Sequence, residues 1–279
     1  MKKKHFQENR RSGEFSKRIV STIWQEVPSA ENDYLTQEAY CHGYNLLELM
    51  DKRSFEDVLL LLLQGELPSP ERKELLRNLM IGLINPGPRH PATRAAIIAG
   101  VGKSDPKHIL PIALSLMGGD HLGAGEVAKS MEFLRYQLKK DPRQVAQALL
   151  QESQRAEQGE DWLPAAGFGS CFGGRDPMAQ AIASRLLALP GAGKALHWGE
   201  LFAEELATQQ MGWRIPGVAA AAFLDLNISG LQSWIGAGLF QLLSAPGLLA
   251  HGLEFHMQPL TAYPFPSDDQ YVIECDAKP

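Results

Sequence analysis

The stretch Gly43–Pro68 reads GYNLLELMDKRSFEDVLLLLLQGELP, and it decides the fold class of the chain. Ser54, with Asp57 three residues later, is typical of a capping box at the start of a helix, and the apolar run Val58–Leu63 follows at once. Just beyond the stretch, Ser69-Pro70 predicts the start of another helix, because proline suits the first helical position. The stretch therefore predicts consecutive helices rather than strands.

The helical pattern begins at Leu46 and continues toward the C-terminus. Breaks are expected at Asn85–Pro88, at Gly118-Gly119, in the polar loop Ala156–Asp161 and in the glycine-rich connection Gly167–Gly174. Between the breaks we expect helices around Ala95–Ala99, over His108–Met117, from Ala124 toward Lys140, from Pro142 to about Arg155, and over Pro177–Leu189, Trp198–Gln210, Pro216–Asp225 and Leu231–Phe255, the last interrupted at Pro246-Gly247. By contrast, Ile19–Tyr40 predicts short strands or extended chain. The expected fold class is all-α with a small β element near the N-terminus, and a second one at the C-terminal end is left open.

The composition is that of an ordinary globular protein. The chain has 279 residues, 44% of them hydrophobic, and its 27 basic and 32 acidic side chains give a formal net charge of -5. Binding to nucleic acid requires a surplus of basic charge, so we expect no nucleic-acid partner, and the basic segment Met1–Arg18 is predicted to be a disordered tail. No apolar segment follows this tail, so no signal peptide is expected. Apolar runs such as Val58–Leu63 are far shorter than the roughly 20 residues that span a bilayer, so no membrane partner is expected.

The cysteines and histidines indicate neither a disulfide framework nor a metal site. Cys41, Cys171 and Cys275 are few and scattered. His90 and His108 lack neighbours at the spacing of metal ligands. We therefore expect a cytoplasmic protein without a metal.

Four segments together resemble the citrate synthase family. They are Gly43–Pro68, which matches in residue type and spacing, Gly118–Glu126, Gly167–Ser170 followed by Asp176-Pro177, and Ser244–Glu254. The chain length is most similar to the compact citryl-CoA lyases and to the citrate-synthase-like module of ATP-citrate lyase.

This resemblance implies an all-α fold of two domains with a cleft between them, usually as a homodimer. On this chain it implies a tail and extended segment at 1–30, a large helical domain at 31–123 and 229–279, and a small helical domain at 124–228. The implied reaction makes or breaks a carbon–carbon bond between an acyl-CoA thioester and a keto acid, which are then the expected small-molecule partners. Such a reaction requires a base, a donor to the thioester oxygen and a pocket for the acid.

The functional residues of the family carry over only in part. His121 falls on the histidine that hydrogen-bonds the thioester oxygen, but Ser170 stands where a second histidine belongs. Further positions depart from the family: Pro216 replaces the catalytic base, Met178 replaces an arginine, Pro86 replaces a histidine, and Gln258–Tyr263 lacks the expected arginine. Ordinary citrate synthesis is therefore not expected, because a dicarboxylate acid would lack the cations that offset its desolvation.

The resemblance gives catalytic roles to His121, Ser170 and Asp120, and substrate-binding roles to Arg175, Glu126, His251, Gly167 and Gly169. Most of these residues have a plainer reading as well. Asp120 either orients the imidazole of His121 or caps the following helix. Glu126 either faces the cleft or lies on the solvated or interdomain face of its helix. Arg175 either meets an anion or pairs with Asp176.

The remaining candidates also leave alternatives open. Gly167 and Gly169 either offer amide groups to phosphate or pantetheine or simply form a loop. His251 either touches substrate or packs at the cleft floor or the dimer interface. For the base, the sequence leaves three carboxylates open: Asp120, Glu126 and Asp225.

Three kinds of function fit these residues. The leading one is a citryl-CoA-lyase-type enzyme in which His121 polarises the thioester carbonyl and Ser170 supports the second carbonyl. The alternative is a degenerate, non-catalytic relative that serves as a ligand sensor or partner subunit. A third is an enzyme with a cleft rebuilt for an uncharged or less carboxylated acceptor. In each case we expect a homodimer through the apolar faces near Ala95–Ala99 and Leu110–Met117.

Overall fold

The computed structural model describes residues 21–153, 163–228 and 233–262. Several sequence predictions lie outside these ranges: the tail Met1–Arg18, the loop Ala156–Asp161, the helix start at Leu231, Cys275 and the C-terminal β element. Within the described ranges the fold is mostly helical, as predicted, and the strands are short.

The elements follow one another with few long connections. The helices are α1 (Leu46–Lys52), α2 (Phe55–Gln64), α3 (Pro70–Leu83), α4 (Pro91–Val101), α5 (Pro106–Met117), α6 (Ala124–Gln137), α7 (Pro142–Ser153), α8 (Pro177–Leu187), α9 (Lys194–Leu206), the 3-10 helix η1 (Ala207–Gln209), α10 (Ile215–Asp225) and α11 (Ser233–Met257). The strands are β1 (Trp24–Pro28), β2 (Thr36–Cys41), β3 (Tyr44–Asn45), β4 (Phe168–Gly169) and β5 (Gly212–Trp213).

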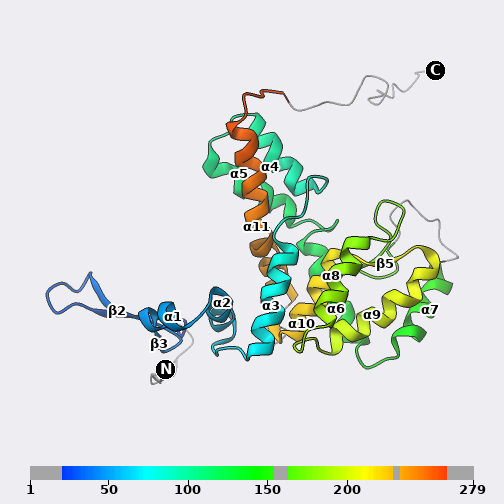
Figure 1. Ribbon diagram of the computed structural model, residues 1–279, viewed down its shortest axis with the longest axis horizontal. Helices are drawn as coiled ribbons and strands as arrows, with labels where there is room; N and C mark the ends of the chain where they lie inside the picture. Colours follow the sequence, from blue (N-terminus) through cyan, green and yellow to red (C-terminus); the bar gives the residue numbers. More distant parts are fainter. Residues whose placement is uncertain (1–20, 154–162, 229–232, 263–279) are drawn as a thin grey trace, which may run out of the picture.

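The N-terminal part forms an arm that extends from the body of the molecule (Figure 1). Strands β1, β2 and β3 make an antiparallel sheet in that order, which confirms the predicted extended segment from residue 24 onward. The predicted capping box is present at the start of α2, where Ser54 and Asp57 exchange contacts with each other's backbone. Local sequence signals therefore account for this part of the chain.

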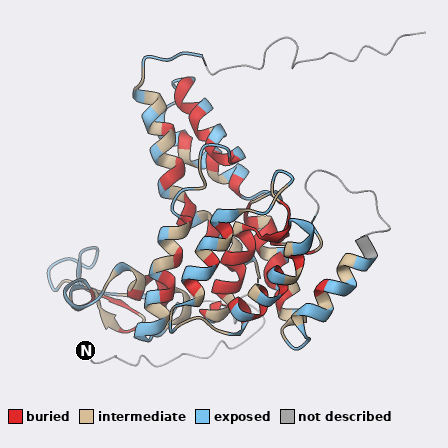
Figure 2. Cartoon of the chain, turned by 45° about the vertical axis from the view of Figure 1, so that its right-hand side comes forward, coloured by how far each residue is buried: buried red, intermediate tan, exposed pale blue. Residues whose placement is uncertain are grey.

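The helices of the body surround α10, whose residues from Pro216 to Phe223 are all buried. Helices α6 and α9 pack against it, and the buried residues gather where these helices face one another (Figure 2). An aromatic cluster joins α6, α9, β4 and β5, with its rings 4.6 to 6.2 Å apart: Phe133, Phe168, Trp198, Phe202 and Trp213. This cluster anchors strand β4 and thereby the start of the glycine-rich connection.

Helices α4, α5 and the far part of α11 form an upper lobe (Figure 1). The lobe depends on a close approach of α4 and α11, because a Cβ atom at Gly100 would lie 2.3 Å from the carbonyl oxygen of Gly252. The other end of α11 contacts α6 of the body. The division into a large and a small domain at residues 123 and 229 stays a prediction, since α11 reaches both groups of helices.

The prediction that the last helix is interrupted at Pro246 is wrong, because α11 runs unbroken from Ser233 to Met257. Proline removes one amide donor and crowds the preceding turn of a helix. Here Pro246 is exposed, and the next amide, that of Gly247, donates to the carbonyl oxygen of Ile84 at the end of α3, 2.9 Å away. The helix therefore continues past Pro246, and the amide that follows the proline joins α11 to the end of α3.

The predicted start of the helix at Trp198 is also wrong, since α9 begins at Lys194. Its first amides are capped by a distant side chain. The carboxylate of Asp225 accepts hydrogen bonds from Gly193, Ala195 and Leu196. The residues next to the start of α9 therefore include no capping side chain from which the helix start could be predicted.

Among the described residues, α11 is the one helix long and apolar enough to cross a membrane by length and composition. The prediction from short apolar runs overlooked it. Its residues Leu239, Phe240 and Leu248 are buried, and the helix packs against α4, α5 and α6. A core helix with partners on several sides passes the same test of length and composition.

Candidate functional site

A cavity of about 390 Å³ is lined by residues of α3, α5, α8, α10 and α11 and by residues of the loops that precede α4, α6 and α8. Residues that are far apart in the sequence line it: Gly82, Leu83, Asn85, Pro86, Arg89, His90, Met117, Leu122, Cys171, Phe172, Arg175, Asp176, Pro177, Met178, Ile182, Ile215, Phe240 and Ser244. A cavity of this size suits a small molecule, since ligand sites are commonly about 300 to 1,000 Å³. Two of the substituted positions, Pro86 and Met178, are in its wall, and so is Arg175.

The turn that carries His121 borders this cavity at Leu122. Leu122 has a positive φ of 56°, a backbone conformation that few side chains adopt without support. Its carbonyl oxygen contacts Nε2 of His90 at 3.2 Å, and its amide donates to a carboxylate oxygen of Glu126 at 2.8 Å. The turn is therefore held from both sides, while the His121 side chain itself is exposed and is not among the lining residues.

His90 is buried, and its two hydrogen bonds determine the tautomer of its imidazole ring. Its Nδ1 accepts a hydrogen bond from the amide of Ala92 at the start of α4, so the proton is on Nε2, which donates to Leu122. Burial lowers the pKa of His90, and the nearby His121 adds to this effect. His90 is thus a neutral donor that positions the turn, a role the sequence analysis missed.

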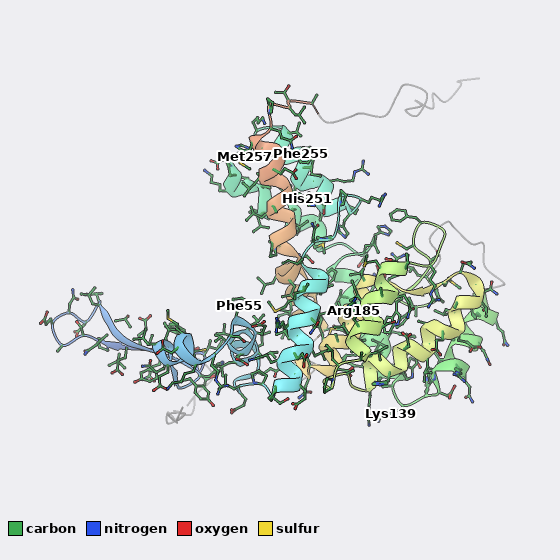
Figure 3. The ribbon with its side chains drawn as sticks, in the orientation of Figure 1. Phe55, Lys139, Arg185, His251, Phe255 and Met257 are labelled. Carbon is green, nitrogen blue, oxygen red and sulfur yellow. The ribbon has the colours of Figure 1, made fainter. Side chains whose placement is uncertain are left out.

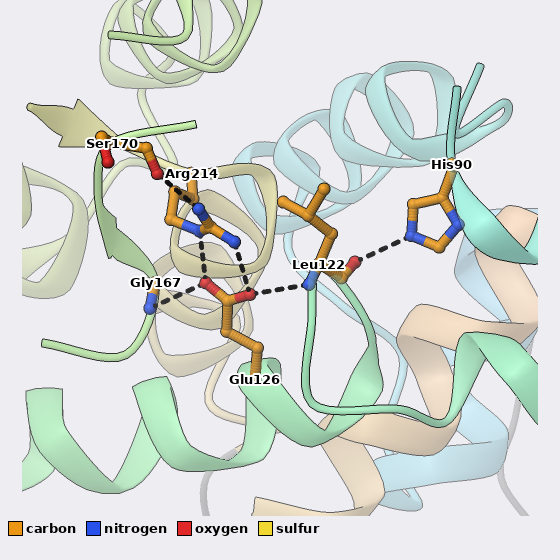
Figure 4. A network of polar contacts seen from close by, with 6 residues as sticks. All are labelled: His90, Leu122, Glu126, Gly167, Ser170 and Arg214. Atoms are coloured by element: carbon orange, nitrogen blue, oxygen red, sulfur yellow. Dashed lines mark hydrogen bonds and ion pairs between the residues drawn. The ribbon is translucent and has the colours of Figure 1, made fainter. Parts of the chain in front are cut away.

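A buried ion pair ties this turn to the glycine-rich connection (Figure 4). Arg214 Nε and Glu126 Oε1 are 2.8 Å apart, and both side chains are almost completely buried. Glu126 also accepts from the amide of Gly167 at 3.2 Å, and Arg214 donates to the carbonyl oxygen of Ser170. Glu126 is therefore neither solvated nor open to the cavity, because its side chain is buried and its oxygens are occupied by protein donors.

The glycines of the connection serve packing and strand pairing. The amide and carbonyl of Gly167 are taken by Glu126 and Arg214, and its Cα lies against Gly217 so closely that a Cβ there would be 2.5 Å from that residue. Gly169 pairs with Gly212 in the small sheet of β4 and β5. The amide of Gly167 is therefore not available to a phosphate group.

Ser170 directly follows β4 and is 8% exposed. Its neighbour Cys171 lines the cavity, but Ser170 is not among the lining residues. The structure thus brings the Ser170 backbone to the Arg214 pair rather than its side chain to the cavity wall.

Two guanidinium groups belong to the cavity. Arg175 donates to the side chain of Gln180 at 2.6 Å and not to Asp176, whose carboxylate instead caps α8 through the amide of Met178. Arg89 has no hydrogen-bond or ion-pair partner among the described residues. Sequence reasoning missed Arg89, although it directly precedes His90, the N-cap of α4, and the N-terminus of a helix favours anions.

The other candidates lie apart from the cavity. Asp120 is exposed and pairs with Lys129 at 2.9 Å, while the N-cap of α6 is Gly123, so Asp120 does not cap that helix. His251, on α11 in the upper lobe (Figure 3), contacts Asn85 at 3.2 Å and reaches the cavity only through that residue. Asp225 caps α9 as described, and burial raises its pKa. Within the described ranges no group of three or more histidine, cysteine or acidic side chains is placed to hold a metal ion.

Comparison with known proteins gives matches in structure but none in sequence. No family model and no curated protein matches the chain. Citryl-CoA lyase from Hydrogenobacter thermophilus is 20% identical, with a TM-score of 0.71 over 94% of this chain and 96% of that one. ATP citrate lyase of Methanosaeta concilii, solved with (3S)-citryl-CoA, is 18% identical with a TM-score of 0.72, and the match covers 96% of this chain but 43% of that one.

Citrate synthase from Thermoplasma acidophilum, solved with carboxymethyl coenzyme A and oxaloacetate, is 18% identical with a TM-score of 0.59 over 81% of this chain and 58% of that one. The chain thus spans less than two thirds of the length of the ATP citrate lyase and citrate synthase chains. These likenesses agree with the sequence motifs, and they show that the chain has the mostly helical fold of the citrate synthase-like proteins.

Proposed function

We propose that this protein binds a CoA thioester together with a small keto acid and acts as an acyl-CoA-dependent carbon–carbon lyase or acyltransferase. The observation that carries the proposal is the cavity. The positions singled out by the sequence motifs, Pro86, Met178 and the turn of His121, come from distant segments and border the same space. Arg89 and Arg175 supply cations there for a carboxylate or a phosphate.

In this proposal His121 donates to the thioester oxygen as negative charge develops on it. His90 and Glu126 hold the turn, so that the donor is positioned before the reaction. Ser170 supports the second carbonyl less well than the sequence suggested, because its side chain is not part of the cavity wall. Ordinary citrate synthesis is not part of the proposal, since Met178 gives a second carboxylate no cation.

The experiment is a screen of acyl-CoA and keto-acid pairs, with products detected by mass spectrometry. His121→Ala should lower the rate of any pair that reacts by on the order of a hundredfold, the typical cost of removing one such donor. His108→Ala, at an exposed histidine of α5 away from the cavity, should leave the rate unchanged. Full activity in His121→Ala would contradict the proposed role.

A non-catalytic ligand sensor or partner subunit is the second candidate, and one observation favours it. Each carboxylate considered as the base is engaged elsewhere: Asp120 with Lys129, Glu126 with Arg214, and Asp225 with the amides of α9. Binding of a CoA thioester without turnover of any pair would support this candidate over the enzyme.

We also propose that the protein is a homodimer in the cytoplasm. Three residues near the dimer interface predicted from the sequence, Ala96, Ile97 and Ala99, are buried inside the chain. The interface must therefore use other side chains. Exposed apolar side chains remain on α4 and α5, namely Ile98, Ile112 and Leu116. An apolar groove of about 560 Å³ lies beside α3 and α11, and its lining includes Phe55, Ile81, Ile84, Leu242 and Leu249. Light scattering should give about twice the chain mass of 30.7 kDa, and a value near 30.7 kDa at micromolar concentration would contradict the dimer.

A further inference from the structure

The cavity has a charged mouth and an apolar floor. Arg89 and Arg175 are exposed and belong to the loops before α4 and α8. The floor is made by residues that are almost completely buried: the apolar Leu83, Met117 and Phe240, with relative exposures of 3%, 1% and 1%, and one hydroxyl residue, Ser244, with 1%. A ligand that fills the cavity must therefore place its charged group at the mouth and an uncharged group on the floor.

The charged groups of the lining add up to one positive charge. Arg89 and Arg175 are cations, and Asp176 is the acidic residue among the lining side chains. His90 adds no charge, because Nδ1 accepts from the Ala92 amide and the single ring proton is on Nε2. Arg175 is held in place by Gln180, and its side chain packs on Gly212 of β5. The balance suits a ligand with one negative charge.

The apolar wall would reject a second carboxylate. Met178 is 64% exposed, and the half-buried Ile182 and Ile215 line the same cavity. None of these side chains donates a hydrogen bond, so a carboxylate buried against them would lose its water without gaining a partner. A hydrocarbon group would gain instead, and a methylene in an apolar pocket commonly changes discrimination by tenfold or more.

We propose that the acid taken by this site is a 2-oxo acid with one carboxylate and a branched or aromatic hydrocarbon side chain. The 2-oxo group rests on the proposed function, whereas the single charge and the apolar body follow from the cavity. The carboxylate lies between Arg89 and Arg175, and the hydrocarbon lies on Met117 and Phe240.

The test is isothermal titration calorimetry with a matched pair of acids, in the presence and absence of CoA. The acid 4-methyl-2-oxopentanoate has one carboxylate and a branched apolar side chain, and oxaloacetate has two carboxylates and the same number of non-hydrogen atoms. The branched acid should bind on the order of tenfold more tightly or better. Equal affinities, tighter binding of oxaloacetate, or no binding of the branched acid would overturn the proposal.

Three variants locate the ligand. Arg89→Gln and Arg175→Gln should each weaken the branched acid by on the order of tenfold. The control Arg185→Gln, at an exposed arginine of α8 outside the cavity (Figure 3), should not. Met178→Arg should reverse the preference toward oxaloacetate. Unchanged affinities in all three cavity variants would overturn the proposal even if the branched acid binds.

The outcomes also separate this proposal from the proposed function. If CoA thioesters neither bind nor react while the branched acid binds at the cavity, the proposed function fails and the ligand class stands. If CoA-dependent turnover uses oxaloacetate, the proposed function stands and the ligand class fails.

Discussion

The buried pair of Glu126 and Arg214 should be the most sensitive point of the candidate site. The side chains of the pair are 2% and 0% exposed, and their closest approach is 2.8 Å. Glu126 also accepts from two backbone amides, those of Leu122 and Gly167. Replacing Glu126 therefore affects a buried cation and both of the loops that border the cavity.

The expected loss in the free energy of unfolding depends on which buried charge each variant leaves without its partner. In Glu126→Gln the Arg214 guanidinium loses its counter-charge, and the new amide group must turn an N–H toward one of the existing donors. Breaking a buried ion pair from one side commonly costs about 3 to 5 kcal/mol, so we expect about 3 kcal/mol for this near-isosteric change. Arg214→Met should cost about 4 kcal/mol, because it leaves a buried carboxylate with only the two amide donors.

The double variant Glu126→Gln/Arg214→Met removes both charges. It should be at least about 2 kcal/mol more stable than the sum of the single losses predicts, since neither charge is then stranded. The control Glu204→Gln, in an exposed pair with Arg143 at 4.0 Å, should change stability by less than about 0.5 kcal/mol.

Urea unfolding followed by circular dichroism measures the free energy of unfolding of the wild type and of the four variants. A cost below about 1 kcal/mol for Glu126→Gln, or strictly additive losses in the double variant, would refute the reasoning about a stranded charge. Titration of a CoA thioester provides a second readout: Glu126→Gln should weaken binding because one of the two amide contacts, at Leu122 of the His121 turn or at Gly167, is lost.

Three further predictions concern pH and helix packing. The lowered pKa of His90 means that around its usual value of 6.5 the unfolded chain binds more protons than the folded one, so stability should fall as the pH drops through 6.5, and His90→Asn, which keeps an N-cap residue, should reduce that fall in urea unfolding. Gly252→Ala places a Cβ 2.2 Å from Ile109 Cγ2 and should cost about 2 to 3 kcal/mol, whereas Gly238→Ala, with open space around it, should stabilise by about 0.5 to 1 kcal/mol; equal effects would contradict the packing of the upper lobe. Lys103→Met loses donors to the carbonyl oxygens of Phe255, His256 and Gln258 at the end of α11, and should lower the thermal midpoint by an amount equivalent to about 1 kcal/mol, whereas no change would show that these contacts contribute nothing.

Features that depend on neighbours in the sequence could be predicted, and features set by distant residues could not. The capping box at Ser54 and the helix start at Pro70 rely on a few adjacent residues, and both predictions are confirmed. The first turn of α9 was missed because its cap, Asp225, comes from another helix. The interruption expected at Pro246 does not occur, since the amide after it finds a partner on α3.

The same division holds for the candidate site. The motifs around His121 and Ser170 led to the fold and to the segments that border the cavity. The partner of Glu126 could not be foreseen, because Arg214 lies 88 residues away and a glutamate on a helix ordinarily reads as solvated. Arg89 was overlooked because it belongs to no motif, and only the fold brings its loop beside that of Arg175.

The most direct test of the account is a crystal structure of the protein with an unreactive acetyl-CoA analogue and 4-methyl-2-oxopentanoate. The thioester oxygen should lie next to His121, the carboxylate within hydrogen-bond distance of Arg89 or Arg175, and the hydrocarbon against Met117 and Phe240. Density for the analogue at another surface, with the cavity empty of both ligands, would contradict it.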